Sequence, residues 1–161
     1  MLAQINSYIE TAFCTVLKLT FGIMIIVVLM QVLFRNILQL PLIWTLDLAQ
    51  LCFSWCIFIG AAVAFRRDAH YQLDIIPASW KAAAKWQRII ALLLSAIVIY
   101  VLLVYGIVFT EIGLTRSSLS LGITELWFFL PIPLGAASMV LFFIERMTAE
   151  LQLSTGEELK E

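Results

Sequence analysis

Two cysteines with helical spacing are the first residues of this sequence whose types could support chemistry. Cys52 and Cys56 are four residues apart, so a helix would place both thiols on one face, and Cys14 is the third cysteine. A quinone-linked thiol oxidoreductase is therefore one alternative function. Such an enzyme is expected to carry paired cysteines in loops on the oxidising side of a membrane, whereas Cys52 and Cys56 lie inside an apolar run. We therefore expect the cysteines to be structural, as buried free cysteines usually are.

The single histidine, His70, lies in the charged segment that contains Arg66, Arg67, Asp68 and Asp74. One histidine excludes haem ligation by two histidines of this chain, and no cysteine or carboxylate cluster around it has metal-ligand spacing. The sequence also lacks the Ser–His–acid or Cys–His context that nucleophilic catalysis needs. We predict that the chain is not an enzyme and binds no metal or cofactor. His70 is expected to form a hydrogen bond with Asp68 or Asp74.

The elements that position these residues follow from the composition. Hydrophobic residues make up 63% of the 161 residues and the mean hydropathy is +1.01, whereas roughly half of an ordinary soluble domain is apolar. A soluble fold of this length could not bury so much apolar surface, so lipid must solvate most of it. The net charge of −1 and the pI near 5.8 argue against a nucleic-acid partner. The sequence predicts an integral membrane protein.

Four apolar runs are long enough to cross a bilayer as helices. The clearest contains 18 uncharged residues between Asp47 and Arg66, about 27 Å of helix at roughly 1.5 Å per residue. The first run is expected to extend backward through residues 9–17 as an amphipathic lead-in, and Lys18 at the start of the run is expected to reach the membrane surface. We predict an all-α integral membrane protein with one membrane domain over residues 1–161 and spans near 17–34, 48–65, 89–109 and 126–146.

The fourth run contains two prolines, Pro131 and Pro133, that allow two interpretations. They either kink a continuous helix or mark its first turn, where proline is tolerated. We favour a helix that begins near Pro131, because Trp127 and the two following phenylalanines then form an aromatic belt at the membrane surface.

The basic residues are distributed unequally between the two sides of these spans. Two of them, Arg35 and Arg116, lie on one side, and eight lie on the other. The positive-inside rule therefore places both termini, the middle loop and a polar tail over residues 147–161 in the cytoplasm. The eight are Lys18, Arg66, Arg67, Lys81, Lys85, Arg88, Arg146 and Lys160.

The middle loop contains a mixture of tryptophan, basic residues and alanine over residues 79–88. This pattern predicts a short interfacial helix on the cytoplasmic membrane surface. The alternative is an ordinary aromatic and basic belt before the third span. The membrane-interface residues are Trp80, Lys81, Lys85, Trp86 and Arg88.

The charges inside the spans bear on a third class of function, an independent small exporter or channel. Such a protein should carry ionisable residues within its spans. Here all ten basic and eleven acidic residues lie at span ends, in loops or in tails. We therefore expect no substrate-binding site in this chain.

One segment carries most of a family resemblance. The stretch WTLDLAQLCFSWCIFIGAAVAFRRDAHYQLD resembles the small membrane subunit of tripartite ATP-independent periplasmic (TRAP) transporters, the DctQ-type protein, and residues 118–135 resemble the same family's entry into its last span. The family more often has glutamate where this chain has Asp47. The matching residues, which are also the expected subunit interface, are Trp44, Asp47, Trp55, Gly60, Ala61, Ala62, Arg66, His70 and Asp74.

The resemblance implies a division of labour among three proteins in a bacterial inner membrane. A large DctM-type membrane subunit would carry the substrate and sodium sites, and a periplasmic binding protein would deliver an organic acid such as a C4-dicarboxylate or sialic acid. The small subunit would be an accessory scaffold that anchors the large one in the lipid bilayer. Arg35 and Arg116, on the predicted outer side, are candidate contacts for the binding protein.

Overall fold

The computed structural model describes residues 2–40, 42–67 and 81–158, all of which are helical or lie in short connections. Four helices in these ranges are long and apolar enough to cross a membrane: Gln4–Leu38, Ile43–Arg66, Ile90–Leu114 and Leu126–Glu145. The predicted all-α fold with four spans is confirmed. The elements are α1 (Leu2–Leu33), the π-helical turn η1 (Phe34–Leu38), α2 (Ile43–Arg66), α3 (Lys81–Leu114), α4 (Leu126–Phe129) and α5 (Pro131–Glu158).

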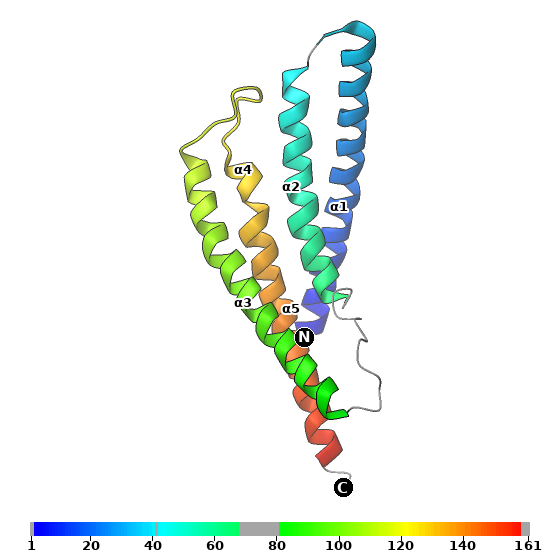
Figure 1. The fold of residues 1–161 in the computed structure, drawn as a ribbon, viewed down its shortest axis with the longest axis vertical. Helices are drawn as coiled ribbons and strands as arrows, with labels where there is room; N and C mark the ends of the chain where they lie inside the picture. Colours follow the sequence, from blue (N-terminus) through cyan, green and yellow to red (C-terminus); the bar gives the residue numbers. More distant parts are fainter. Residues whose placement is uncertain (1, 41, 68–80, 159–161) are drawn as a thin grey trace.

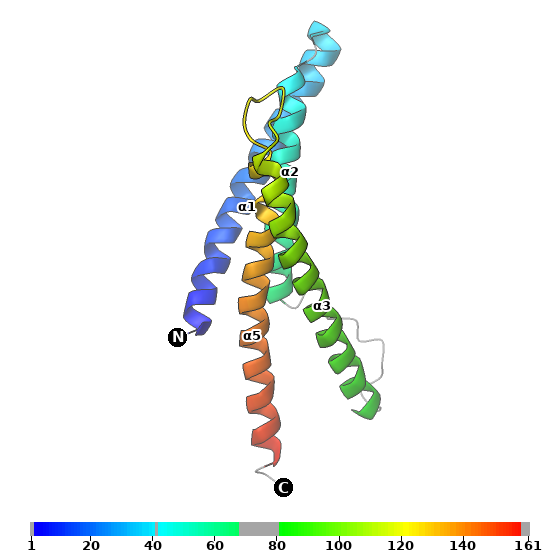
Figure 2. The ribbon, with the colours of Figure 1, turned by 90° about the vertical axis from the view of Figure 1, so that its left-hand side faces the viewer.

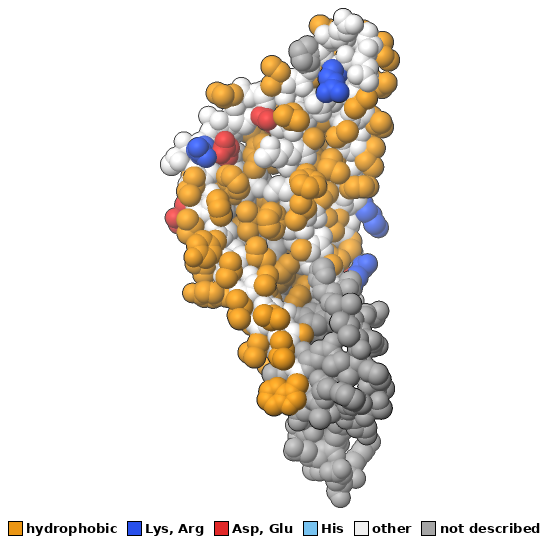
Figure 3. All heavy atoms as spheres, viewed as in Figure 1, with side chains coloured by type: hydrophobic (Ala, Val, Ile, Leu, Met, Phe, Trp, Pro, Cys, Tyr) orange, Lys and Arg blue, Asp and Glu red, His pale blue; other side chains and the backbone are white. Residues whose placement is uncertain are grey.

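The helices form an open layer and not a closed bundle. Among the described residues, α2 packs between α1 and α5, which also contact each other, whereas α3 packs against α4 and α5 and against neither α1 nor α2. Figure 1 shows the resulting order across the layer, with α1 at one edge and α3 at the other. Both chain ends lie at the same end of the molecule, where the helices diverge in the second view (Figures 1 and 2). Hydrophobic side chains cover most of the described surface visible in Figure 3, as expected for helices solvated by lipid.

The first helix includes the expected backward extension and begins still earlier. α1 continues without a break through residues 9–17 and starts at Leu2. The hydroxyls of Thr11 and Thr15 donate to the carbonyls of Ser7 and Thr11, both at 2.9 Å, so these polar groups are satisfied within the helix. Ile9 and Phe13 pack against the hydrophobic core. Lys18 consequently lies in the middle of α1 and not at its start.

The predicted short helix over residues 79–88 is not seen as a separate element. Residues 79 and 80 lie outside the described residues, and residues 81–88 form the first turns of α3, continuous with the third span. An uninterrupted helix satisfies its backbone hydrogen bonds internally, and the segment has no proline after Pro77 to interrupt it.

The fourth span begins as the favoured interpretation predicts. The short α4 ends at Phe129, and α5 starts at the buried residue Pro131. Proline fits this first position because its missing N–H group would have no helical partner there. The aromatic residues Trp127 and Phe128 therefore lie on α4, directly before the long helix.

The core lies along α5, which packs against α2 on one side and α3 on the other. Ala62, Ile99 and Phe142 are buried in one cluster that also contains Phe65 and Met139. Small residues allow the backbones to approach closely: a Cβ atom built on Gly135 would lie 2.7 Å from the carbonyl oxygen of Phe58 in α2. Such contacts are typical of helix pairs in membranes, where packing replaces the hydrophobic effect.

Candidate functional site

A group of charged and polar side chains joins three helices at the end of the molecule that holds the termini. We call it the Arg66 cluster; its members are Asn6 and Glu10 of α1, Arg66 of α2 and Glu145 of α5. Arg66 Nη1 lies 2.5 Å from Glu10 Oε2 and donates to the carbonyl oxygen of Asn6 at 2.7 Å. Arg66 Nε lies 3.8 Å from Glu145 Oε2. One guanidinium therefore connects α1, α2 and α5.

The Arg66 cluster is largely buried, which strengthens the electrostatic attraction between its charged side chains. The side chains of Arg66, Glu10 and Glu145 are 17%, 22% and 28% exposed, so water screens them less than it screens a surface pair. The guanidinium carbon of Arg66 also lies 5.3 Å from the ring centre of Phe142, within the range of a cation–π contact.

Asn6 is the most deeply buried member of the cluster, with no exposed surface. Its amide nitrogen donates to Glu145 Oε2 at 2.6 Å and to the carbonyl of Leu141 at 3.4 Å. Its amide oxygen is buried without a hydrogen-bond partner in the structure. The amide therefore fastens α1 to α5 through its nitrogen alone.

Arg67 extends the cluster toward solvent. Its Nε donates to Glu10 Oε1 at 2.7 Å and its Nη2 to the Cys14 sulfur at 3.4 Å. The hydrogen bond with Glu10, with a smaller effect of Cys14, raises the pKa of the Arg67 guanidinium above its ordinary value. The side chain is 61% exposed, so this pair contributes less than the Arg66 contacts.

A second set of polar contacts lies at the opposite end of α2. The Asp47 carboxylate accepts hydrogen bonds from the hydroxyls of Ser118 and Ser120, in the loop that follows α3. The loop is closed by a bridge between Ser117 and Thr124. Asp47 therefore fixes the loop against the first turns of α2.

Between its ends, α2 is fastened to α4 by hydrogen bonds to main-chain carbonyls. Ser54 Oγ donates to the carbonyl of Phe128 at 2.6 Å, and Trp55 Nε1 donates to that of Trp127 at 3.0 Å. Together with the close approach at Gly135 and the Asp47 contacts, these bonds join the two segments that carry the family resemblance. Position 47 contacts positions 118 and 120, and positions 54, 55 and 58 contact positions 128, 127 and 135, respectively.

The small residues of α2 lie within the chain's own packing. Ala62 is fully buried in the core and Ala61 packs against it, while Gly60 lies near Leu17 of α1. In this structure the side chain of Ala62 thus serves internal packing and is not available to a partner. Its place in a subunit interface stays a prediction.

Cys52 and Cys56 are both free thiols, and Cys56 contacts α1. Cys52 is buried, and the Cys56 sulfur lies 3.4 Å from the Thr20 hydroxyl oxygen. Within the part of the chain that the structure describes, no group of three or more His, Cys, Asp or Glu side chains could hold a metal ion.

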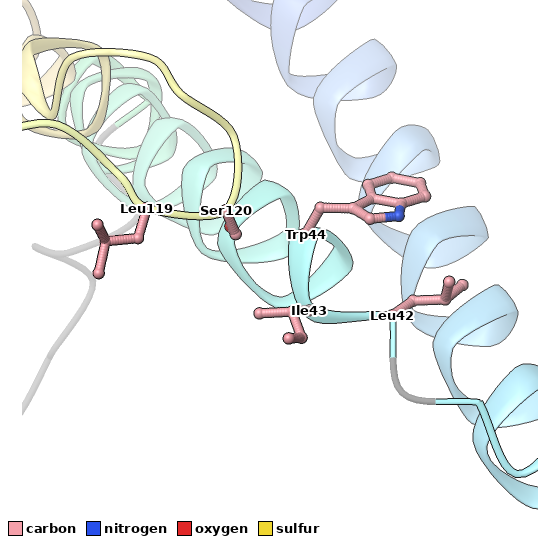
Figure 4. A pocket seen from close by; sticks show the side chains of 5 residues that line it. All are labelled: Leu42, Ile43, Trp44, Leu119 and Ser120. Atoms are coloured by element: carbon pink, nitrogen blue, oxygen red, sulfur yellow. The ribbon is translucent and has the colours of Figure 1, made fainter.

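Other residues singled out from the sequence lie apart from these contacts. Trp44 is 38% exposed and lines a hollow of about 480 Å³ with Leu42, Ile43, Leu119 and Ser120. Figure 4 shows that α2 and the loop after α3 form its two walls. A neighbouring hollow of about 420 Å³ includes Asp47.

The basic and aromatic residues outside the contacts are placed as follows. Arg35 is exposed in η1 and Arg116 is exposed in the loop after α3, both at the end opposite the termini. Trp86 is exposed, and Lys81, Lys85 and Arg88 lie in the same first turns of α3. Three residues that the sequence analysis assigned to the subunit or membrane interface, His70, Asp74 and Trp80, lie outside the residues that the structure describes.

Sequence reasoning missed the partners of Arg66. Asn6, Glu10 and Phe13 recur at intervals of three and four, which is the spacing of one helical face. This spacing could have predicted a face of α1 that packs on the core, but only if the helix was known to begin near residue 2. The sequence predicted a hydrogen bond of His70 with Asp68 or Asp74 and no partner for Arg66.

The amino-acid sequence of this chain is similar to those of known membrane-transport proteins. Residues 24–153 match the family described as "Tripartite ATP-independent periplasmic transporters, DctQ component". The chain is 30% identical over 139 residues to the sialic acid TRAP transporter permease protein SiaT of Haemophilus influenzae, an alignment that covers 85% of this chain and 21% of that protein. It is 24% identical over 123 residues to the sialic acid TRAP transporter small permease protein SiaQ of Vibrio cholerae, covering 76% and 71%. The chain thus spans about a fifth of the first relative and most of the second.

Proposed function

The chain belongs to the DctQ component family of tripartite ATP-independent periplasmic transporters, and we propose that it acts as a rigid scaffold for a large membrane subunit. In this proposal the large subunit carries the substrate and sodium sites and moves during transport. The small chain enlarges the static part of the complex and anchors it in the bilayer. A periplasmic binding protein supplies the substrate.

The observation that supports a scaffold is the attachment of α2 along its whole length. Asp47 holds one end to the loop after α3, Ser54 and Trp55 hold the middle to α4, and Arg66 holds the other end to α1 and α5. Polar contacts in a low-dielectric surrounding favour one arrangement over alternatives, because any other would leave the groups unpaired. A helix attached in this way suits a stationary support.

The open layer supports the same role. Because α3 does not close back on α1 in the described residues, both broad faces of the layer remain available to lipid or to another subunit. A single layer of helices presents more contact area per residue than a closed bundle. This shape is suited to extending a larger membrane protein.

We propose that both termini lie in the cytoplasm of a bacterial inner-membrane system. The termini share one end of the molecule, and the Arg66 cluster lies at the same end (Figure 1). Eight of the ten basic residues belong to segments on that side in the predicted topology, which is the pattern that the positive-inside rule associates with the cytoplasm. The Asp47 end would then face the periplasm.

The proposed cargo is an organic acid taken up with sodium. Both curated relatives are named for sialic acid, which makes a sialic acid or another carboxylate the first substrate to test. In this proposal the large subunit and the binding protein determine which substrate is transported, and this chain carries no substrate site of its own.

The test is reconstitution of the three proteins in liposomes. Uptake of labelled organic acid under an inward sodium gradient is expected when the chain, the large subunit and the binding protein are all present, and it should fall to background when the chain is omitted. Equal uptake without the chain would exclude an essential scaffold. Transport by the purified chain alone would instead establish an independent transporter.

A matched pair of variants tests whether the attachment of α2 matters. Arg66→Met removes the guanidinium that joins three helices, whereas Arg67→Met removes the neighbouring, mostly exposed one. Uptake should drop strongly for the first variant and stay near wild type for the second, at equal amounts of chain in the membrane. Equal uptake by both variants would contradict the idea that rigidity at the Arg66 cluster supports transport.

A further inference from the structure

Two charged residues on opposite edges of the layer lie almost level with each other. Lys18 belongs to α1, which forms one edge, and Glu111 belongs to α3, which forms the other (Figure 1). Both residues are exposed. Their heights can be compared along α2, because α1 contacts α2 directly and α3 is connected to it through α4.

The height of Lys18 follows from its neighbours on α1. The Leu17 side chain lies 3.8 Å from the Cβ position of Gly60. The Thr20 hydroxyl oxygen lies 3.4 Å from the Cys56 sulfur. Lys18 is therefore level with the turn of α2 between Cys56 and Gly60, about 12 Å from the charged end of that helix.

The height of Glu111 follows from the packing of α3 on α4. A Cβ atom built on Gly113 would lie 2.9 Å from the main-chain nitrogen of Leu126, the first residue of α4. The short helix is attached to α2 where Ser54 donates to the carbonyl of Phe128 at 2.6 Å. Glu111 comes two residues before Gly113 and is therefore level with Ser54. The two charged residues thus differ in height along α2 by about four residues, or roughly 6 Å.

An upright α2 would hold both charges inside the hydrocarbon. The uncharged run between Asp47 and Arg66 is about 27 Å long, close to the hydrocarbon thickness of roughly 30 Å. With this run perpendicular to the membrane, Glu111 would lie about 10 Å below one surface and Lys18 about 12 Å below the other. A lysine stem reaches roughly 6 Å and a glutamate stem less. Charged residues at such depth normally face the interior of a bundle, whereas these two lie on the outer edges of a layer.

A tilt of the layer removes this conflict. The path from α1 through α2 and α4 to α3 comprises three helix contacts of about 8–10 Å each, so the two edges are up to about 24–30 Å apart. Tilting the layer by about 30–40° toward its α1 edge separates the edges by about 12–19 Å along the membrane normal. With the difference in height and the reach of both side chains, the charged groups are then about 27–34 Å apart, which matches the hydrocarbon.

The lengths of the helices favour the same tilt independently. The 24 residues of Ile43–Arg66 form α2, and their length of about 36 Å shortens to about 28–31 Å along the normal at a tilt of 30–40°. In α1 the uncharged run between Lys18 and Arg35 has 16 residues, about 24 Å, so both basic side chains can reach the surfaces. In α3 the uncharged run between Arg88 and Glu111 has 22 residues, about 33 Å. Figure 1 shows α3 leaning away from α1, so a rotation that lowers the α1 edge brings α3 closer to the normal.

We propose that the chain crosses the bilayer obliquely, with α2 tilted by about 30–40° and the α1 edge displaced toward the surface that holds the chain termini. At that surface the Lys18 ammonium binds lipid phosphate. Glu111 meets the headgroup layer of the opposite surface. This placement goes beyond the proposed function, because it depends on the spans and not on a partner subunit.

Two pairs of positions distinguish a tilted chain from an upright one. Ile23 of α1 and Ile112 of α3 are exposed and level with positions 53–54 of α2, and Thr15 of α1 and Val101 of α3 are exposed and level with positions 61–62. In an upright chain the two members of each pair lie at equal depth. In the tilted chain Thr15 and Ile112 lie near opposite surfaces, whereas Ile23 and Val101 lie near the middle of the hydrocarbon.

The first experiment measures these depths by spin labelling. Each position is changed to cysteine in the full chain with its three native cysteines replaced by alanine, labelled with a nitroxide and reconstituted in vesicles of phosphatidylethanolamine and phosphatidylglycerol. Collision with oxygen and with a water-soluble nickel complex reports the depth. The labels at positions 15 and 112 should lie roughly 10 Å closer to the nearest surface than those at 101 and 23. Circular dichroism of each labelled chain reports folding separately.

The second experiment tests the contact of Lys18 with lipid phosphate. Lys18→Leu removes the charge that holds the α1 edge at the surface, so the label at position 15 should move deeper by roughly 3–6 Å. Lys18→Arg keeps the charge and should leave that label in place. An unchanged depth in Lys18→Leu would show that Lys18 does not hold this edge.

The depth measurements decide the placement independently of transport. Equal depths within both pairs would overturn the tilt, and so would deeper labels at positions 15 and 112 than at 101 and 23. Because each pair compares two helices by itself, one poorly folded variant leaves the other pair to decide. Uptake by the reconstituted complex is a separate measurement, so a failure of the tilt would leave the scaffold function standing.

Discussion

The close approach of α2 and α5 at Gly135 gives a prediction whose size can be worked from the structure. A Cβ atom at position 135 would lie 2.7 Å from the Phe58 carbonyl oxygen and 3.2 Å from its carbonyl carbon. Ordinary contact begins at 3.4 Å, so Gly135→Ala would push the two helices apart by about 0.7 Å at this point. Both obstructing atoms belong to the backbone, so no side-chain rotation can relieve the contact.

The control is a glycine of the same chain with free space around it. No atom lies within 4 Å of a Cβ built on Gly22, so Gly22→Ala should gain the usual helix preference of alanine without a clash, up to about 1 kcal/mol. Gly135→Ala gains the same preference and loses about 1–3 kcal/mol through overpacking. The two variants should therefore differ in free energy of unfolding by about 1–3 kcal/mol.

The assay is unfolding of the purified chain in mixed micelles by increasing mole fractions of sodium dodecyl sulfate, followed by tryptophan fluorescence. Gly135→Ala should unfold at a lower mole fraction than wild type, and Gly22→Ala at the same or a higher one. If Gly135→Ala were as stable as Gly22→Ala, the helices would not be in backbone contact at this position. The packing that attaches α2 to α5 would then need another explanation.

Three further substitutions test the polar contacts of α2 and α1. Asp47→Asn weakens the acceptor of two serine hydroxyls, so amide hydrogen exchange in the loop after α3 should accelerate; unchanged exchange would show that the loop holds itself. Trp55→Phe removes a donor to a main-chain carbonyl and should lower the free energy of unfolding by about 1 kcal/mol, whereas Trp44→Phe, at a partly exposed position, should have little effect; equal stability of the two variants would argue against the bond. Asn6→Ala removes donors to a carboxylate and a carbonyl and should destabilise the chain by about 1–3 kcal/mol, against almost no change for the exposed Gln4→Ala; a neutral Asn6→Ala would show that α1 and α5 are held elsewhere.

The spans could be predicted from the sequence because the bilayer dictates their length and composition. The run between Asp47 and Arg66 has no charge, and a helix is one of the few structures that satisfies every backbone group in lipid. The start of α5 at Pro131 also followed from local chemistry, since proline tolerates the first turn of a helix and not its interior.

The partners of Arg66 could not be predicted in the same way. Glu10 is 56 residues and Glu145 is 79 residues from Arg66 in sequence, and their encounter depends on where α1 begins and on which helices are neighbours. A charged residue near the N-terminus looks like the end of a span. In the structure α1 is continuous from Leu2, and the packing of Ile9 and Phe13 on the core holds this part of the helix in place.

The order of the helices across the layer differs from their order in the chain. α5 follows α3 and α4 in the chain, yet it packs against both α2 and α3. A nascent chain that ends before α4 lacks the carbonyl acceptors of Ser54 and Trp55, and until most of α5 is made Arg66 also lacks Glu145. The contacts of α2 with the second half of the chain can therefore form only after residue 126 is made, and a chain truncated before that residue is expected to leave α2 without them.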